Sequence, residues 1–210
     1  MKKVVSFDGH GTLFEEAPDH YRKIAQMLNT EESTVRAAYS RIVSHRLRGY
    51  PELVSDDIIQ TFWLSVYQEI AGFATAFRQT NLGKMVLDYA MTKEAWVPKL
   101  LGVRFLKYAS KLGFRCILCS EWDSWIAALL EHFGLNKLFD EMYITGLQGH
   151  AKWTPMFWSY VLSEEALSHP SRLLHVGNDP LTDEKIPRGL GIETFSIRAS
   201  FMEFRVKLES

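Results

Sequence analysis

The chain has 210 residues, of which 47% are hydrophobic and 23% are charged, and its formal net charge is −1 at pH 7. These values exclude collagen-like, low-complexity and disordered chains. The balanced charge excludes broad electrostatic attraction to nucleic acid or to an anionic membrane, so a charged substrate must be captured by a local site. No window approaches the roughly 18 apolar residues of a membrane span, and no signal-peptide pattern follows the two N-terminal lysines. We therefore expect a cytoplasmic protein.

The first predicted element is a short buried strand from Val4 to Asp8. Its residues are mostly apolar, and the turn Gly9-His10-Gly11 follows at once. From about Ala17 to Ala90 apolar residues recur instead at helical spacing, and one helix in this stretch has an N-cap signal at Ser55. We expect an all-helical block inserted after the first strand.

After Pro98 the predicted elements alternate between helix and strand. Such repeated units indicate parallel strands, because parallel neighbours need crossover helices. The predicted fold class is therefore α/β, a doubly wound parallel sheet of Rossmann-like type with an inserted α-helical cap. We expect residues 1–15 and 95–210 to form the core and residues 16–94 to form the cap. The predicted helices are Lys99–Lys111, Ser124–Phe133, 155–162 and one ending near Leu190, and the predicted strands are Phe114–Cys119, Met142–Thr145, Leu173–Val176 and Glu193–Ile197.

Polar residues of complementary types follow four of the predicted strands. In open α/β sheets, ligands bind at the carboxyl ends of the strands, near the point where the strand order reverses. A carboxylate, a hydroxyl, an ammonium and an acidic cluster can together attack, orient and neutralise an electrophilic anion, so we expect these side chains to surround one pocket. They are Asp8 and Thr12 after the first strand, Ser120 after the second, Lys152 after the third, and Asn178, Asp179 and Asp183 after the fourth.

Four segments, in order, resemble the signatures of the haloacid-dehalogenase-like (HAD) hydrolase superfamily. Phe7–Phe14 resembles the first signature, a nucleophilic Asp followed by a Gly-Thr turn. Ser120 at the end of an apolar strand is similar to the second motif, Lys152 to the third, and His175–Asp183 to the acidic fourth. The resemblance spans Lys3 to about Ile197, and the helical block stands where the family's helical-cap phosphatases have their cap.

The resemblance implies a covalent mechanism. Asp8 would be the nucleophile, and Thr12 and Ser120 would hydrogen-bond the transferring group. Lys152 would neutralise the charge of the nucleophile and the substrate, and His10 would move a proton. In the family's phosphatases Mg²⁺ bridges the nucleophile and the phosphate. The implied metal ligands in this chain are Asp8, the backbone carbonyl of His10, Asn178, Asp179 and Asp183.

Three positions depart from the family pattern. His10 stands where the phosphatases have a second Asp; its imidazole either shuttles protons near neutral pH or merely fills the turn. Asn178 opens the fourth motif in place of Asp, so the metal affinity is expected to be reduced. Glu121 stands beside the expected phosphate pocket, where Asn is common. Its carboxylate either contacts the substrate or caps the helix that begins near Ser124.

The predicted cap contains a cationic candidate site. Arg41, His45 and Arg48 recur at spacings that place them on one helical face. Arg41 is therefore a candidate for binding a substrate carboxylate or a second phosphate. The alternative is a solvated basic helix surface.

The function that these residues predict is that of a Mg²⁺-dependent phosphatase, acting on a small phosphorylated metabolite through an aspartyl-phosphate intermediate. Two alternatives stay open. One is a catalytically impaired HAD-like protein that binds a ligand or protein partner through the same cleft. The other is a 2-haloacid dehalogenase-type hydrolase, which the family builds with the same Asp and Lys but without Mg²⁺. We expect a small-molecule substrate, no nucleic-acid or membrane partner, and a monomer or homodimer.

Overall fold

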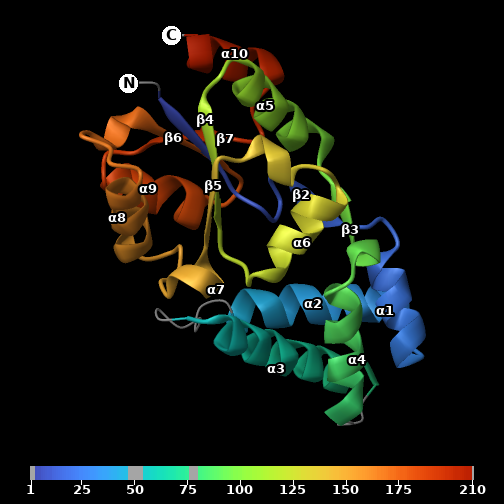
Figure 1. Ribbon diagram of the computed structural model, residues 1–210. Helices are drawn as coiled ribbons and strands as arrows, with labels where there is room; N and C mark the ends of the chain where they lie inside the picture. Colours follow the sequence, from blue (N-terminus) through green and yellow to red (C-terminus); the bar gives the residue numbers. More distant parts are fainter. Residues whose placement is uncertain (1–2, 47–53, 76–79, 210) are drawn as a thin grey trace. The chain divides into compact units, whose positions relative to one another are not determined.

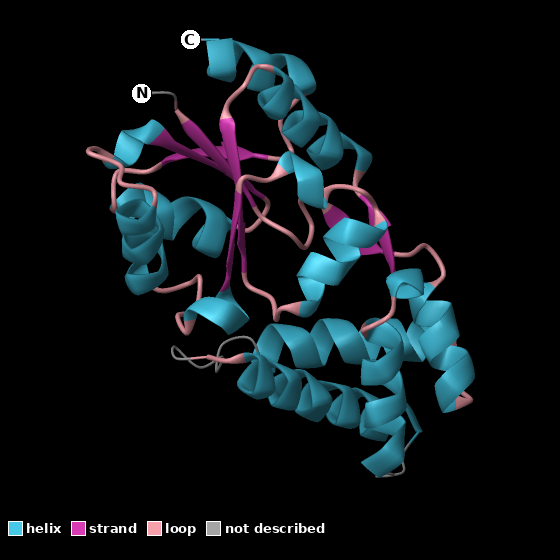
Figure 2. Ribbon diagram, in the orientation of Figure 1, coloured by secondary structure: helices cyan, strands magenta, loops and turns pink. Residues whose placement is uncertain are grey.

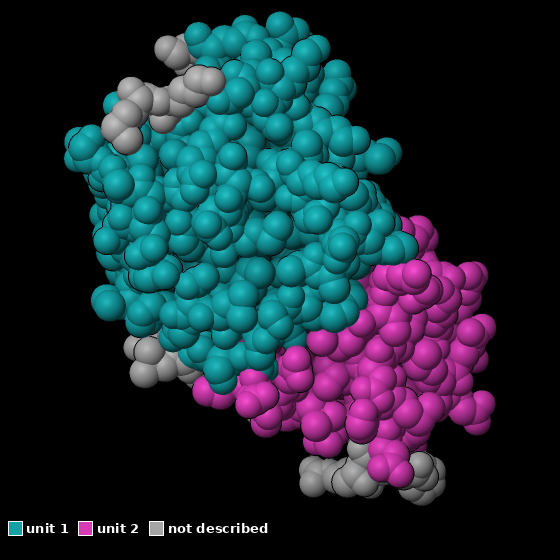
Figure 3. Space-filling model, viewed as in Figure 1, with its two compact units in different colours: residues 1–15, 52–56, 98–210 teal, residues 16–51, 57–97 magenta. Residues whose placement is uncertain are grey.

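The structure is a computed structural model that describes residues 3–46, 54–75 and 80–209 (Figure 1). The chain separates into two compact units (Figure 3). The chain leaves the first unit after Glu15, belongs to it again at residues 54–56, and returns to it finally at Pro98. The expected boundaries placed residues 54–56 in the cap and residues 95–97 in the core. Unit 1 contains the described residues 3–15, 54–56 and 98–209, and unit 2 contains the described residues 16–46, 57–75 and 80–97.

Unit 1 is built on five parallel strands, which are β1 (Val4–Phe7), β4 (Arg115–Ser120), β5 (Glu141–Ile144), β6 (Leu173–Gly177) and β7 (Glu193–Ser196). Their order in the sheet is β5-β4-β1-β6-β7, and each neighbouring pair is parallel. The strands are drawn in magenta in Figure 2. Along the chain, β4 and β5 are added to the sheet on one side of β1, and β6 and β7 are then added on the other side. The strand order therefore reverses beside β1, which confirms the predicted doubly wound α/β class.

Helices cover both faces of this sheet. They are α5 (Leu100–Lys111), α6 (Trp125–His132), α8 (Pro155–Glu164), α9 (Ile186–Gly189) and α10 (Phe201–Glu209). On one face Phe105 of α5 stacks on Phe204 of α10 with ring centroids 4.3 Å apart, and Phe7 packs edge-on against Phe204. On the other face Trp158 of α8 packs in a cluster with Ile117. Because side chains alternate along a strand, the apolar strands supply both of these contact faces.

Several short elements were not predicted. β2 (Phe14–Glu16) and β3 (Trp96–Pro98) form a two-stranded sheet where the chain leaves and re-enters the unit. The short helix α7 (Thr145–Gln148) follows β5, and a turn of π-helix, η5 (Pro180–Lys185), follows β6. The remaining short turns are the 3₁₀ segments η3 (Asn136–Leu138) and η4 (Pro170–Arg172).

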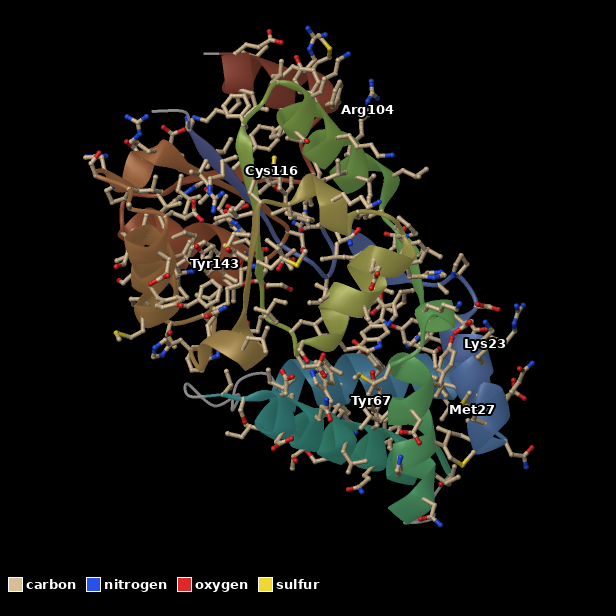
Figure 4. All side chains as sticks on the ribbon, in the orientation of Figure 1. Lys23, Met27, Tyr67, Arg104, Cys116 and Tyr143 are labelled. Carbon is tan, nitrogen blue, oxygen red and sulfur yellow. The ribbon has the colours of Figure 1, made fainter. Side chains whose placement is uncertain are left out.

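Unit 2 is helical, as expected. Its helices are α1 (His20–Leu28), α2 (Glu32–Arg46), α3 (Asp56–Thr75), α4 (Thr80–Ala90) and the short η2 (Lys93–Ala95). Ile24, Val35, Ile70 and Val86 are among the buried apolar residues of its core, and Tyr67 lies in the same core (Figure 4). α3 begins at Asp56 and therefore starts in unit 1. None of the described helices has the length and apolar character that a membrane span requires.

Candidate active site

The site forms at the carboxyl edge of the sheet, where β4, β1 and β6 are neighbours. Phe7, the last residue of β1, is paired with Leu118 on one side and Val176 on the other. Asp8 follows directly, and its backbone N–H donates to Val176 O at 2.9 Å. The backbone of Asp8 is thus fixed beside the reversal of strand order, where open α/β sheets bind ligands.

Lys152 connects Asp8 to the fourth motif. Its Nζ donates to Asp8 Oδ1 at 2.6 Å and also to Asp183 Oδ1. Only 1% of the Lys152 side chain is exposed, and an ammonium buried to that extent requires anionic partners. The Lys152 carbonyl accepts a hydrogen bond from Trp158 Nε1 at 3.0 Å. The structure therefore brings together the carboxylates and the ammonium that were expected to converge from distant segments.

Asp183 is held by four hydrogen-bond donors. Its Oδ1 accepts from Lys152 Nζ and from His175 Nε2, the latter at 3.1 Å. Its Oδ2 accepts from the backbone N–H groups of Asn178 and Asp179, both at 2.8 Å. Asp183 lies in the π-helical turn η5, a rare wide turn that is frequent at functional sites. With both oxygens engaged, Asp183 orients Lys152.

His175 and Trp158 are parts of this site that sequence analysis did not identify. The Asp183 carboxylate can only accept, so His175 Nε2 carries the proton and Nδ1 accepts from Ser6 Oγ at 2.8 Å. The Trp158 ring packs edge-on against the imidazole, with centroids 4.7 Å apart. Burial and the charge of Lys152 lower the pKa of His175 to about 4, so the ring is neutral near pH 7. Ser6 and His175 are partners on β1 and β6, a register that becomes visible only in the structure.

Burial and the shared ammonium set the protonation states of the site. Burial raises the pKa of Asp8 to about 6, and the charge of Asp183 adds to this effect while Lys152 opposes it. Burial also acts to raise the pKa of Asp183, but Lys152 and the His175 hydrogen bond outweigh it and hold that pKa well below its usual range. Burial acts to lower the pKa of Lys152, yet the two carboxylates raise it above its usual value. Near neutral pH, Asp8 and Asp183 are therefore ionised and Lys152 is an ammonium.

Ser120 ends β4 with its hydroxyl beside the turn that follows Asp8. A Cβ built on Gly9 would lie 2.6 Å from Ser120 Oγ, so only glycine leaves room for this approach. The Ser120 Oγ is buried and has no hydrogen-bond partner among the described residues. Leaving a buried hydroxyl unsatisfied costs about 1–3 kcal/mol, and a bound anion at Ser120 would remove that penalty.

Thr12 has a different arrangement from the one expected. Its hydroxyl is buried and donates to Asn178 Oδ1 at 3.0 Å. This hydrogen bond fixes the side chain of Asn178. It also occupies the single hydroxyl proton of Thr12, which is then not available to donate to a substrate. A contact between Thr12 and the transferring group therefore stays a prediction.

His10 lies on the exposed side of the turn after β1. Its ring packs edge-on against Trp122, with centroids 6.1 Å apart. A positive charge on His10 acts to lower the pKa of Asp8. His10 is therefore near the nucleophile, and its proposed role in proton transfer stays a prediction.

Glu121 does not cap α6, and the capping alternative is wrong. The N–H of Ser124 donates instead to Asp56 Oδ1 at 2.9 Å, and the N–H of Trp125 donates to Asp123 Oδ1 at 3.2 Å. Glu121 is partly buried, and its Oε1 is enclosed without a hydrogen-bond partner among the described residues. Contact of Glu121 with a substrate stays a prediction.

The expected metal ligands are only partly free to bind a cation. Asp179 is exposed, and its Oδ1 accepts from the backbone N–H groups of Leu181 and Thr182, both at 2.8 Å, so it caps η5. Within the described residues, no group of three or more His, Cys, Asp or Glu side chains is arranged to hold a metal ion. Asp8 Oδ2 and Asn178 Oδ1 keep acceptor capacity. One carboxylate, one amide oxygen and a backbone carbonyl fit a Mg²⁺ ion that also binds substrate phosphate.

Arg41 belongs to unit 2. It lies on α2, where its side chain is exposed and its guanidinium carbon is 5.7 Å from the centroid of the Phe73 ring. Arg48, on the same predicted face, lies outside the described residues. Binding of a substrate anion by Arg41 stays a prediction.

The absence of a side chain at Gly177 lets the Asp183 carboxylate lie close to the backbone. A Cβ at this position would lie 2.2 Å from Asp183 Cγ. We expect Gly177→Ala to displace the carboxylate, to lower the free energy of unfolding by about 1–3 kcal/mol, and to reduce any turnover that depends on Lys152. Gly189→Ala is the matched control, because a Cβ there meets nothing within 4 Å. Denaturant unfolding measures the free energy of unfolding of the two variants. Equal values would contradict the close packing of Gly177 against Asp183.

The fold of this chain matches that of solved HAD proteins. No protein-family model and no curated protein matches the sequence. The structure of the HAD-hydrolase YfnB from Bacillus subtilis, which is bound to magnesium, superposes over 100% of both chains with a TM-score of 0.71 and 15% identity. The chain has the fold of the HAD hydrolases.

Two other HAD neighbours differ from each other in activity. The L-2-haloacid dehalogenase RSc1362 covers 99% of this chain and 97% of its own, with a TM-score of 0.72 and 13% identity. A HAD phosphatase from Thermococcus onnurineus covers 92% of this chain and 85% of its own, with a TM-score of 0.58 and 18% identity. The HAD fold of this chain is therefore shared by phosphatases and by dehalogenases.

Proposed function

We propose that this chain is a HAD phosphatase that hydrolyses a small phosphomonoester through a phosphorylated Asp8. The observation that carries the proposal is the buried hydrogen bond from Lys152 Nζ to Asp8 Oδ1 beside the unpartnered hydroxyl of Ser120. This set supplies a nucleophile, a positive charge and a donor for an anionic group. The acidic fourth motif, whose Asp183 fixes Lys152, agrees with the phosphatase form of the signature.

The chemistry divides into two displacements at phosphorus. In the first, the Asp8 carboxylate forms a bond to phosphorus as the bond to the leaving oxygen breaks. Ser120 donates to a phosphoryl oxygen, and Lys152 offsets the negative charge that the carboxylate and the phosphoryl group bring together. In the second, water attacks the phosphorus of the aspartyl phosphate, and Asp8 is released as a carboxylate.

Magnesium is the cofactor that this proposal includes. Asp8, Asn178 and the carbonyl of His10 would hold it, and the ion would offset charge on the phosphoryl oxygens. Asp179 and Asp183 are not included, because their carboxylates accept hydrogen bonds from the η5 turn, Lys152 and His175. Since the donor set contains a single carboxylate, we expect weak binding of magnesium in the absence of substrate.

A metal-free 2-haloacid dehalogenase is the second candidate. The observation that favours it is the same small donor set, because displacement of halide by Asp8 needs the carboxylate and Lys152 but no metal. The intermediate would then be an ester of Asp8, and water would attack its carbonyl carbon. The two candidates thus share a nucleophile and differ in the atom that it attacks.

Two assays separate these candidates. The phosphatase proposal predicts phosphate release from p-nitrophenyl phosphate that requires Mg²⁺, is abolished by a chelator and is absent in Asp8→Asn. Chloride release from 2-chloropropionate without metal would favour the dehalogenase and overturn the proposal. Neither product from the wild-type protein would support the impaired, ligand-binding alternative.

The pKa of Asp8 predicts an acidic limit to the activity. Protonated Asp8 is not a nucleophile, and its pKa is raised to about 6 by burial. We expect kcat/KM at constant magnesium to be level above this pH and to fall about tenfold per pH unit below it. Two phosphate monoesters whose phosphate groups ionise at different pH should show this decrease in kcat/KM at the same pH. A limit that instead follows the ionisation of each substrate would contradict the assignment to Asp8.

A further inference from the structure

A continuous chain of buried hydrogen bonds leads from the middle of β1 to the nucleophile. Ser6 Oγ lies 2.8 Å from His175 Nδ1, and His175 Nε2 lies 3.1 Å from Asp183 Oδ1. Lys152 Nζ donates to the same Asp183 oxygen and, at 2.6 Å, to Asp8 Oδ1. Ser6 and His175 are both completely buried, so their polar atoms require partners within the protein. Each step from His175 to the reacting carboxylate is therefore a direct contact.

The Asp183 carboxylate is fixed in place but shared at one oxygen. Its Oδ2 accepts from two backbone N–H groups, so the carboxylate cannot rotate without losing these hydrogen bonds. Its Oδ1 accepts from Lys152 and from His175. Without the His175 proton, more of the charge on Oδ1 would act on the ammonium, which would shift toward Asp183 and away from Asp8. The donor on His175 thus influences where Lys152 lies between its two carboxylates.

Trp158 restrains the imidazole and Lys152 together. Its ring packs edge-on against that of His175, with centroids 4.7 Å apart. Its Nε1 donates to the Lys152 carbonyl at 3.0 Å. Since the Trp158 side chain is itself completely buried, it cannot turn away from either partner. The imidazole is therefore held by packing as well as by both of its nitrogens.

This Ser-His-Asp chain is not a second nucleophilic centre. A serine nucleophile needs a hydroxyl that a substrate can reach. Ser6 is 0% exposed and lies inside the central strand of the sheet. Its function must therefore lie in what Asp183 holds, and that is the ammonium of Lys152.

We propose that His175 is a positioning residue that keeps the Lys152 ammonium against Asp8. It acts through Asp183, because its Nε2 proton occupies part of Oδ1 and leaves Lys152 shared between the two carboxylates. Ser6 acts one contact further away: its hydroxyl donates to Nδ1 and so keeps the ring proton on Nε2. The inference rests on the proposed roles of Asp8 and Lys152, which the phosphatase and the dehalogenase candidates have in common.

Two amide variants of His175 test this role. A glutamine amide reaches the position of Nε2 and can still donate to Asp183, whereas an asparagine amide ends near the position of Nδ1 and cannot. In His175→Asn we expect kcat to fall by about 10²-fold, and in His175→Gln to stay within about tenfold of the wild-type value. KM should change by less than about threefold in both, because Lys152 acts mainly on the charge that gathers in the transition state.

The position of the ring proton gives a second readout, which needs no variant. In the wild-type chain labelled with ¹⁵N-histidine, NMR identifies the His175 ring by its through-space contacts with the Trp158 ring. We expect its proton to be bonded to Nε2 and to exchange slowly with solvent. A proton on Nδ1 would overturn the proposal, because Asp183 would then have no donor from His175.

Leu208→Ala is the control for stability. Leu208 is buried on α10, which packs on the opposite face of the sheet from Trp158, so this variant should unfold at a lower temperature and keep wild-type kcat. Each kcat is measured with p-nitrophenyl phosphate or 2-chloropropionate, whichever the wild-type protein turns over. Equal losses in the two His175 variants, or no loss in His175→Asn, would overturn the role of His175 alone. Absence of Asp8-dependent turnover of both substrates would overturn the proposed function, and the inference with it.

Discussion

Replacing Asp8 with asparagine is expected to reduce phosphate release by a factor on the order of 10⁴ to 10⁶, as removal of a catalytic nucleophile does in other enzymes. The amide has nearly the shape of the carboxylate but cannot form the phosphoaspartate. Lys152 keeps its hydrogen bond to Asp183 in this variant, so the buried ammonium retains an anionic partner. The loss should therefore appear in turnover and not in folding.

Asp88→Asn is the matched control for this prediction. Asp88 lies exposed on α4, where it is paired with Lys84. We expect this variant to keep wild-type turnover. Phosphate release by both variants, together with their thermal unfolding, measures the effect. Substantial Asp8→Asn activity with the native fold intact would show that Asp8 is not the nucleophile.

Lys152→Met is expected to remove activity and also to destabilise the fold by about 3–5 kcal/mol, the usual effect of removing one partner from a buried ion pair. Asp8 and Asp183 would then lie buried together without the ammonium that both contact. Their pKa values would rise above those in the unfolded chain. Stability would therefore be highest at acidic pH and would be lost as pH rises, which denaturant unfolding at several pH values can detect.

A second substitution separates charge from packing at this position. In the double variant Lys152→Met/Asp183→Asn one of the uncompensated carboxylates is removed, so we expect part of the lost stability to return while activity stays absent. His175 Nε2 can still donate to the asparagine oxygen. If the double variant is no more stable than Lys152→Met, the destabilisation comes from packing and the ion-pair explanation is wrong.

The sequence was sufficient to predict the sheet and the convergence of its polar strand ends. Val4–Phe7 is mostly apolar and is buried, and a carboxylate follows immediately, so a central strand that ends just before Asp8 could be inferred from local pattern. Parallel strands share one carboxyl edge, which is why Lys152 and Asp183 were expected near Asp8 although they lie far away in the chain. The pairing of β2 with β3 was missed because it joins two short segments separated by the whole of unit 2.

Side-chain direction explains what could not be predicted within the site. Asp179 and Asp183 look equivalent in an acidic motif, but the π-helical turn η5 directs Asp183 inward and leaves Asp179 as a cap. Likewise, the N–H of Ser124, which precedes α6, donates to the Asp56 carboxylate, a contact between distant segments that takes the place of a cap by Glu121. Such choices depend on backbone geometry and on partners that sequence pattern does not identify.

Trapping the covalent intermediate tests the role of Asp8 most directly. Borohydride reduces an aspartyl phosphate to homoserine, and peptide mass spectrometry then identifies the position of the modified residue. During turnover of p-nitrophenyl phosphate we expect homoserine at position 8 of the wild-type chain and none in Asp8→Asn. Rapid turnover with an unmodified Asp8, or reduction at another carboxylate, would contradict the mechanism.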